Sequence, residues 1–390
     1  MDSRDVIHYK VLVIGGDHHN TLGVIESLGV KGIFPYVLAI TNTSWAYVLK
    51  SRYVVDGCVC HNETQIVEWI LTKFNDSDHK AVAIATCDLA ASILDKNYNQ
   101  LSPFLILPNT SISGNLANTM SKEYMSSLAR EVGLNVPKTW VVTDGSVPHD
   151  IEYPCITKAI SSVVGTKENI CVCRDEESLH RFLSKKAKCP IIQIQKFVDK
   201  EYEFQLLGCS MGYGKEILIP GRTHIVRPNG LDNTFFLRFD KIEPEYNSLV
   251  EKVITFIKRT GYQGPFSVEF LRDKDGTSYF TEMNFRNDGN AYCETSAGTN
   301  IPYIYYLYNT GGDYQTEIKK SSVKTTYLTP EFYYFKNMMR GEYGIKEWWH
   351  NMKITTCYTT YFKDDKKPFF WFLLQVFEHG INALKRKFKK

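Results

Sequence analysis

The segment that most constrains the fold is a strand–turn–strand pattern over residues 264–286, which reads GPFSVEFLRDKDGTSYFTEMNFR. An Asp-Gly pair between two alternating apolar runs is a strong signal for a hairpin with a two-residue turn. With Asp275 and Gly276 as that turn, every facing pair of residues follows. The apolar face pairs Phe266 with Phe285, Val268 with Met283 and Phe270 with Thr281, and the polar face pairs Ser267 with Asn284 and Glu269 with Glu282.

The polar face of this predicted hairpin carries the chemistry. Two carboxylates that face each other across a strand pair repel, because their Cβ atoms lie about 5 Å apart. Hard divalent cations prefer carboxylate and amide oxygens, and Mg²⁺ also binds substrate phosphates. The pattern therefore fits one or two Mg²⁺ ions on Glu269, Glu282 and Asn284 beneath a nucleotide triphosphate, with Arg286 stabilising a transferred phosphoryl group. It fits equally a solvated face on which Glu282 and Arg286 form a surface ion pair.

The first 110 residues predict a doubly wound parallel sheet. Buried-type strands at 9–16, 34–41 and 80–86 alternate with helical patterns at 19–32 and 66–74. Two glycines follow the first strand, but the dinucleotide fingerprint G-x-G-x-x-G is absent, so a tight turn is the simpler interpretation. After residue 116 the pattern becomes α+β, with antiparallel strands around single helices.

Composition excludes several classes of protein. A length of 390 residues indicates two or three domains, and a net charge of +3 gives no support for nucleic-acid binding. The N-terminus lacks the basic and apolar regions of a signal peptide, and no run is long enough for a membrane span, so we expect a cytoplasmic protein. Ten cysteines without a C-x-x-C pair indicate buried thiols, with a metal site as the weaker alternative.

Taken in order, these features resemble the ATP-grasp superfamily. The resemblance covers roughly residues 9–310: a strand lysine in CITKA, a loop, QKFV followed by EYE, and then GPFSVEF and FTEMNFR. It is closest to the carbamoyl-phosphate-synthase-like and D-alanine–D-alanine-ligase-like carboxylate–amine ligases. It implies a pre-ATP-grasp α/β domain (1–115), a small lid subdomain (116–200), a catalytic subdomain (201–325) and a C-terminal extension (326–390).

The resemblance also implies roles for individual residues. Lys122 and Lys158 would contact the nucleotide phosphates, and Gln195, Lys196 and Val198 would form the hinge over adenine. Glu201 would accept hydrogen bonds from the ribose hydroxyls, and Glu203 is the alternative acceptor. The arginines at 222, 227 and 286 would act on the γ-phosphate, the substrate carboxylate or the acyl-phosphate. The metal ligands would be Glu269, Glu282 and Asn284, binding Mg²⁺ or alternatively Mn²⁺.

The activity implied is an ATP-dependent ligation in which a carboxylate becomes an acyl-phosphate and an amine then displaces phosphate. Relatives of this kind serve surface-polysaccharide or cell-wall pathways. A nucleotide-binding regulatory or scaffold protein without turnover is the main alternative, and a carboxyphosphate-forming carboxylase is a third. We expect small-molecule substrates, a lipid-linked glycan among the candidate acceptors, and place part of the acceptor pocket near Asn290 and Ser296.

The tail, KPFFWFLLQVFEHGINALKRKFKK, predicts an amphipathic helix with a basic end. An apolar stripe followed by lysines suits contact of residues 368–390 with the inner face of an anionic membrane. The alternative is a helix docked on the core with a frayed basic end. The stripe consists of Phe370, Leu373, Phe377, Ile381, Leu384 and Phe388.

Overall fold

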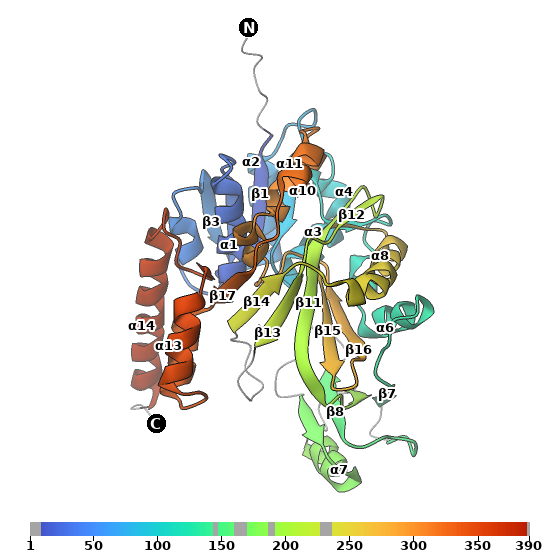
Figure 1. Cartoon of the computed structure of the whole chain (residues 1–390). Helices are drawn as coiled ribbons and strands as arrows, with labels where there is room; N and C mark the ends of the chain where they lie inside the picture. The colour runs from blue at the N-terminus through green and yellow to red at the C-terminus, as the bar shows by residue number, and fades with distance from the viewer. Residues whose placement is uncertain (1–8, 143–146, 160–169, 186–191, 227–235, 388–390) are drawn as a thin grey trace.

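The computed structural model describes residues 9–142, 147–159, 170–185, 192–226 and 236–387, and three β-sheets organise this part of the chain (Figure 1). The mixed α/β and α+β fold predicted from the sequence is confirmed. The domain boundaries at 115, 200 and 325 stay predictions.

The first sheet has five parallel strands in the order β3-β2-β1-β4-β5. Leu12 and Ile14 pack in one apolar cluster and Val11 and Val13 in another, so both faces of the central strand are buried. Burial on both faces explains why this strand reads as a continuous apolar run. The elements are β1 (Val11–Gly16), α1 (His19–Gly29), β2 (Tyr36–Ile40), η1 (Tyr47–Lys50), β3 (Asp56–Cys60), α2 (Glu63–Lys73), β4 (Ala81–Ala85), α3 (Asp88–Lys96), α4 (Tyr98–Leu101) and β5 (Leu105–Ile106).

The second sheet is small and antiparallel, with the order β7-β10-β8-β9. Its core contains Trp140, Ile194 and Leu179, the last from the helix that packs on it (Figure 1). The elements before and within it are β6 (Asn109–Thr110), α5 (Leu116–Thr119), α6 (Lys122–Glu131), β7 (Thr139–Val142), β8 (Cys155–Ala159), β9 (Cys171–Cys173), α7 (Glu176–Lys185) and β10 (Ile192–Lys196).

The third sheet is the largest and follows the path β16-β15-β11-β13-β14-β17-β18, with β12 and β6 at its margins. Its strands are β11 (Lys200–Met211), β12 (Glu216–Leu218), β13 (Arg222–Val226), β14 (Phe236–Asp240), β15 (Tyr262–Asp273), β16 (Ser278–Asn284), β17 (Thr326–Thr329) and β18 (Cys357–Tyr358). The helical elements between them are η3 (Pro244–Tyr246), α8 (Asn247–Thr260), α9 (Tyr292–Ala297), α10 (Ile301–Asn309) and α11 (Tyr314–Lys320).

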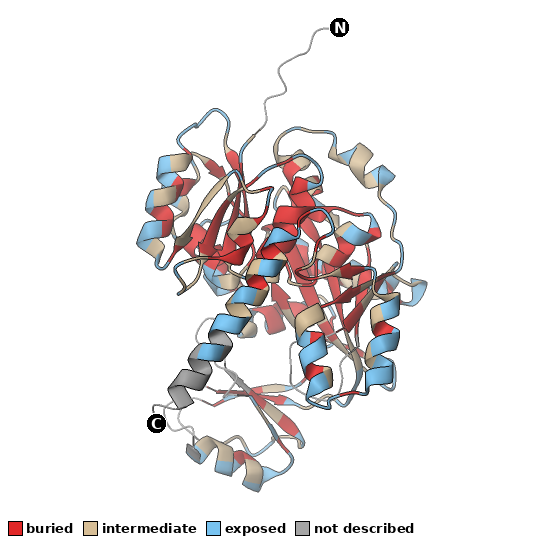
Figure 2. Ribbon diagram, turned by 90° about the vertical axis from the view of Figure 1, so that its left-hand side faces the viewer, coloured by how far each residue is buried: buried red, intermediate tan, exposed pale blue. Residues whose placement is uncertain are grey.

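The C-terminal extension ends in α12 (Glu331–Met339), α13 (Ile345–Ile354) and α14 (Lys367–Lys387). One side of α14 packs on the first sheet's helical segments, where Trp371 meets Trp45 and Phe372 meets Tyr47 edge to face. The opposite side is exposed, and the helix lies across the surface in Figure 2. The exposed apolar residues are Phe370, Leu374, Phe377 and Ile381.

The structure therefore corrects the stripe expected from the sequence. Leu373 is only partly exposed and packs on the core, and Leu374 takes its place on the exposed face. Phe388 and the side chain of Leu384 lie outside the described residues. Among the described helices, none combines the length and the hydropathy that a membrane crossing requires.

Candidate functional site

The hairpin β15–β16 brings the predicted acids together. Ser267 faces Asn284, Val268 faces Met283 and Glu269 faces Glu282, as the sequence predicts. The apolar face is buried, since Val268, Met283 and Phe285 are each at most 3% exposed. Burial of that face fixes the register, because a shift by one residue would turn every apolar side chain outward.

The turn itself differs from the prediction. Asp273 N donates to Thr277 O (3.0 Å), which leaves the three residues 274–276 as the loop, with Gly276 at φ 80°. A three-residue loop that ends in a left-handed glycine shifts the nearby register, so Phe270 faces Phe280 and not Thr281. A β-bulge between Glu269 and Phe270 restores the predicted register before the acids are reached.

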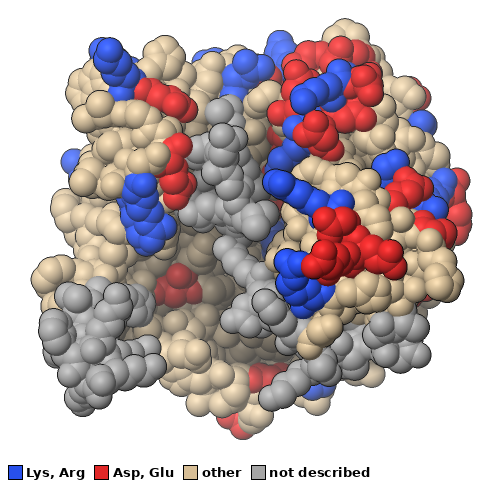
Figure 3. All heavy atoms as spheres, turned by 90° about the horizontal axis from the view of Figure 1, so that it is seen from below, with Lys and Arg blue, Asp and Glu red and all other residues tan. Residues whose placement is uncertain are grey.

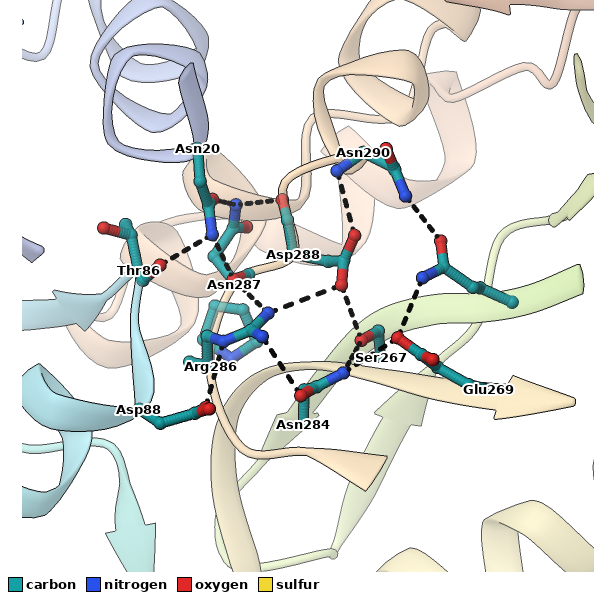
Figure 4. Close-up of polar contacts among 12 residues, drawn as sticks. Asn20, Thr86, Asp88, Ser267, Glu269, Asn284, Arg286, Asn287, Asp288 and Asn290 are labelled. Atoms are coloured by element: carbon teal, nitrogen blue, oxygen red, sulfur yellow. Dashed lines mark hydrogen bonds and ion pairs between the residues drawn. The ribbon is translucent and has the colours of Figure 1, made fainter. Parts of the chain in front are cut away.

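Amide side chains hold Glu269 in place. The Asn284 amide nitrogen donates to Glu269 Oε1 (3.1 Å) and to Ser267 Oγ (3.1 Å), and Gln205 Nε2 donates to the same Glu269 oxygen (3.1 Å). Asn290 supports Gln205 through an Nδ2–Oε1 bond of 2.9 Å. Figure 4 shows these contacts as one network that reaches from β11 to the segment after β16.

Arg286 lies beyond the end of β16, yet its guanidinium returns to the site. Nη2 donates to Asn284 Oδ1 (3.0 Å), Nε pairs with Asp88 Oδ1 (3.1 Å), and Nη1 lies 3.4 Å from Asp288 Oδ2 (Figure 4). The arginine side chain is only 18% exposed. Nη1 also donates to Asn287 O (3.3 Å), so contacts through all three nitrogens fix the plane of the guanidinium.

The first sheet supplies a part of the site that the sequence did not reveal. Asp88 begins α3 immediately after β4, and Asn20 from α1 donates to Thr86 O (2.7 Å) and to Asn287 O (2.6 Å). Carboxyl ends of parallel strands are where α/β sheets place ligands. That rule, applied to the residues after β4, was the signal that could have identified Asp88. Asp288 was also missed.

The charges at the site are unbalanced. Four carboxylates act on the single guanidinium of Arg286: Asp88, Asp288, Glu269 and Glu282. Burial, and then the charges of Glu282 and Asp288, raise the pKa of Glu269 to about 8. His18 lies close by in the same crowded region, where desolvation and the Arg286 charge lower its pKa to about 4, so its ring is neutral at pH 7. The excess of negative charge fits a site that binds a cation.

This charge arrangement predicts a pH dependence of stability for the metal-free protein. A carboxyl with a raised pKa keeps its proton in the folded state while the unfolded chain loses it. Glu269 should therefore contribute a fall in the free energy of unfolding as pH rises from about 4.5 to about 8, of at most about 1.4 kcal/mol per pH unit. Thermal unfolding of Glu269→Gln in EDTA should show a slope that is shallower than that of wild type by this contribution, whereas exposed Glu68→Gln should keep the wild-type slope; equal slopes in wild type and Glu269→Gln would contradict the assignment.

The residues predicted to bind nucleotide lie on and between the two antiparallel sheets. Gln195 and Lys196 end β10, and Val198 lies in the connection to β11, where the chain passes from the small sheet to the large one. Gln195 is buried, and Lys196 is exposed and pairs with Glu152 (2.7 Å).

The remaining nucleotide candidates lie on three elements. Glu201 is exposed in β11, and Glu203 pairs with Lys200. Lys122 begins α6. Lys158 lies in β8 and faces Gln193 of β10, although the side chain of Lys158 is outside the described residues.

The structure does not bring Arg222, predicted to act near the γ-phosphate or the substrate carboxylate, to the cluster around Glu269 and Arg286. Arg222 faces Leu206 across the strand pair β11–β13, whereas Gln205 is the residue that contacts Glu269. Neighbouring residues of a strand point to opposite faces, so Arg222 lies on the other face of the sheet. There it is 6% exposed and forms a two-bond pair with Glu243 (2.8 and 3.1 Å). Arg227 lies outside the described residues.

The described surface is hollowed near its centre when viewed from below, and an acidic side chain is visible within the hollow (Figure 3). Lys, Arg, Asp and Glu side chains are mixed on the right-hand part of this face.

One curated protein matches part of this chain at low sequence identity. No family model matches the chain. The 2-oxoglutarate carboxylase small subunit of Hydrogenobacter thermophilus is 29% identical over 153 residues, which is 36% of this chain and 31% of that protein. The chain therefore aligns with about a third of the length of this curated relative.

Solved structures match much more of the chain. The L-amino acid ligase from Bacillus licheniformis has a TM-score of 0.62 at 16% identity, covering 82% of this chain and 79% of the ligase. A biotin carboxylase from Campylobacter jejuni has a TM-score of 0.65 at 15% identity, covering 83% and 76%. N5-carboxyaminoimidazole synthetase from Staphylococcus aureus, in complex with ADP, has a TM-score of 0.60 at 14% identity, covering 78% of each chain. These structural similarities, together with the sheet topology, show that this chain has the ATP-grasp fold.

Proposed function

We propose that this protein is an ATP-dependent carboxylate–amine ligase. The observation that carries the proposal is the geometry around Arg286: two facing carboxylates, an amide and a guanidinium are held on one face of the large sheet. The ATP-grasp fold supports it, as do the names of two similar structures, an L-amino acid ligase and an N5-carboxyaminoimidazole synthetase.

The acids would hold Mg²⁺, or alternatively Mn²⁺. Glu269, Glu282 and Asn284 offer carboxylate and amide oxygens, which are the ligands these hard ions prefer. The surplus of carboxylates over guanidinium at the site fits one or two divalent ions. When bound, the ion would neutralise charge on the transferred phosphoryl group. The complexes of similar proteins with MgADP and ADP are consistent with this ligand.

The nucleotide would lie between the two antiparallel sheets. Gln195, Lys196 and Val198 would form the adenine hinge, since they occupy the connection between these sheets. Glu201 or Glu203 would accept from the ribose, and Lys122 and Lys158 would contact phosphates. A hinge at the crossing point allows the small sheet to close over the nucleotide and exclude water from a hydrolysable intermediate.

The chain's own residues would mainly position the reactants. The substrate carboxylate attacks the γ-phosphorus in line, the bond to the β-phosphate oxygen breaks, and ADP leaves. Arg286, held by Asp88 and Asn284, would orient the acyl-phosphate and balance its charge. An uncharged amine then attacks the acyl carbon, phosphate leaves, and the amine proton passes to solvent or to a nearby base. No protein nucleophile is needed.

A phosphate-release screen tests the proposal. The full-length protein is incubated with MgATP, single carboxylates, and amines that include amino acids and amino sugars. Phosphate release that requires both partners, with the amide product found by mass spectrometry, is the expected result. Release that requires bicarbonate would instead favour a carboxylase, and nucleotide binding without any release would favour the regulatory or scaffold alternative.

The exposed face of α14 supports a further part of this proposal, contact with a membrane surface. Phe370, Leu374, Phe377 and Ile381 form one helical stripe, and lysines follow toward the C-terminus. Such a contact would suit a lipid-linked glycan acceptor and a role in surface-polysaccharide or cell-wall synthesis. The rest of the protein would then be cytoplasmic, at the inner face of the membrane.

Vesicle binding checks this part of the proposal. The full-length protein should co-sediment with vesicles that contain anionic lipid, and the double variant Phe370→Ser/Phe377→Ser should bind about tenfold less, because two exposed aromatic side chains are lost. Exposed Val55→Ser is the matched control. Equal binding of wild type and double variant would contradict membrane contact through this face.

A further inference from the structure

A cavity of about 260 Å³ lies between α1, α9 and residues 356–364 of the C-terminal extension, and none of the residues around Arg286 lines it. Glu26 in its wall is seven residues along α1 from His19, which lies beside Gly289 of the Arg286 segment. Seven residues of helix span about 10 Å. The cavity is therefore a second site, connected to the first through the paired helices α1 and α9.

Glu26 lines this cavity and contacts a second buried acid, Asp365, which is not among the residues that line it. Glu26 is 2% exposed and Asp365 is 3% exposed. Ser51 Oγ donates to Glu26 Oε1 (3.3 Å), and the backbone N–H of Arg52 donates to Asp365 Oδ2 (2.9 Å). The ion pairs found among the described residues do not include either carboxyl. Two buried acids in contact share a proton unless a cation joins them.

The pKa of Glu26 agrees with this geometry. Burial, followed by the charge of Asp365 and its hydrogen bond, raises the pKa of Glu26 to about 9. The charged and titratable groups around Glu26 and its cavity come from three directions: Lys363, Asp364 and Asp365 from the extension, Arg52 and Tyr53 from the segment after η1, and Tyr292 from α9. The Glu26 carboxyl is therefore uncharged at pH 7 in the empty cavity.

Aromatic rings form much of the remaining wall. Tyr292 and Phe362 meet edge to face with ring centroids 4.7 Å apart, and Tyr358 and Tyr361 do so at 5.9 Å. All four rings line the cavity. Aromatic faces attract cations, and the attraction is stronger where water is excluded.

We propose that this cavity binds a small molecule in which an ammonium group is attached to an apolar or aromatic portion. The ammonium would pair with Glu26 in place of the proton that this carboxyl holds, releasing that proton to solvent, while the apolar portion would lie against the four rings. This proposal does not rest on the ligase activity.

Calorimetric titration of the full-length protein without nucleotide tests it, with benzylamine as probe and benzyl alcohol as its neutral counterpart. We expect saturable 1:1 binding of benzylamine and about tenfold weaker binding of the alcohol. Benzylamine affinity should rise between pH 6 and pH 8, because binding releases the proton that Glu26 holds in the empty cavity.

Glu26→Gln is the decisive variant, since an amide replaces a carboxyl that is already uncharged and the fold should be kept. It should bind both probes equally and lose the pH dependence, whereas the exposed control Glu68→Gln should behave as wild type. A second variant, Tyr361→Leu, should weaken benzylamine binding while keeping its pH dependence. Equal affinity of wild type for both probes, an unchanged preference in Glu26→Gln, or no saturable benzylamine binding would each overturn the proposal.

Discussion

Replacing Glu282 by Gln is expected to reduce MgATP-dependent turnover by at least about 10³-fold while making the metal-free protein slightly more stable. The two effects have one cause. Glu282 faces Glu269 directly, and its charge is the second-largest influence that raises the pKa of Glu269. Without a cation the charge of Glu282 helps to keep Glu269 protonated, so removing that charge lowers the cost of burying Glu269. With a cation, the lost carboxylate is a lost ligand.

Two measurements separate this explanation from a purely structural role. Thermal unfolding in EDTA should give the variant a gain of about 0.5 kcal/mol, whereas added Mg²⁺ should stabilise wild type more than the variant. Phosphate release under the conditions found in the substrate screen gives the turnover. Glu245→Gln, which removes an exposed acid from a weak pair with Arg272 (3.5 Å), is the matched control and should keep both properties. Wild-type-like turnover in Glu282→Gln would refute the metal assignment.

Replacing Arg286 by Lys should lower kcat by about 10³-fold even though the positive charge remains. The guanidinium contacts Asp88, Asn284 and Asp288 through three different nitrogens. A lysine ammonium is a single point and cannot keep these contacts while also facing a transferred phosphoryl group. We therefore expect the loss in kcat to exceed any change in the KM for ATP.

The control for this variant is Arg259→Lys. Arg259 pairs with Glu131 at the surface (2.6 Å), where about half of each side chain is exposed, so its replacement should change turnover less than twofold. Circular dichroism and thermal unfolding should show that Arg286→Lys is folded. If that folded variant keeps more than about a tenth of wild-type kcat, the role given to Arg286 is wrong.

The hairpin shows which structural features the local sequence predicts and which it does not. The facing of Glu269 with Glu282 was predictable because the alternation of Phe, Val and Met fixes which face is buried. The turn was predicted one residue too short. A bulge beside Glu269 compensates for that error, and nothing in the local sequence distinguishes a two-residue turn from a three-residue turn followed by a bulge.

Arg222 shows the opposite case. Arg222 lies in a strand near the site, but whether it can reach a bound phosphate depends on which face of the sheet it occupies. That face is set by pairing with β11, a strand whose register relative to β13 is not encoded in any short motif. Asp88 and Asp288 were missed for a related reason: Asp88 is about 200 residues from Arg286 in sequence and is brought to it only by the packing of the first sheet.

The sequence by itself determined the alternation of strands and helices, the polar face of one hairpin and the likeness to the ATP-grasp superfamily, because periodicity and turn chemistry are local properties. The tertiary structure decided which charges meet. It placed Asp88 and Asp288 on Arg286, moved Arg222 to the other face, and joined Glu26 to Asp365 beside an aromatic cavity. Electrostatic interactions depend on distance through space, and distances between segments remote in sequence exist only after the sheets have packed.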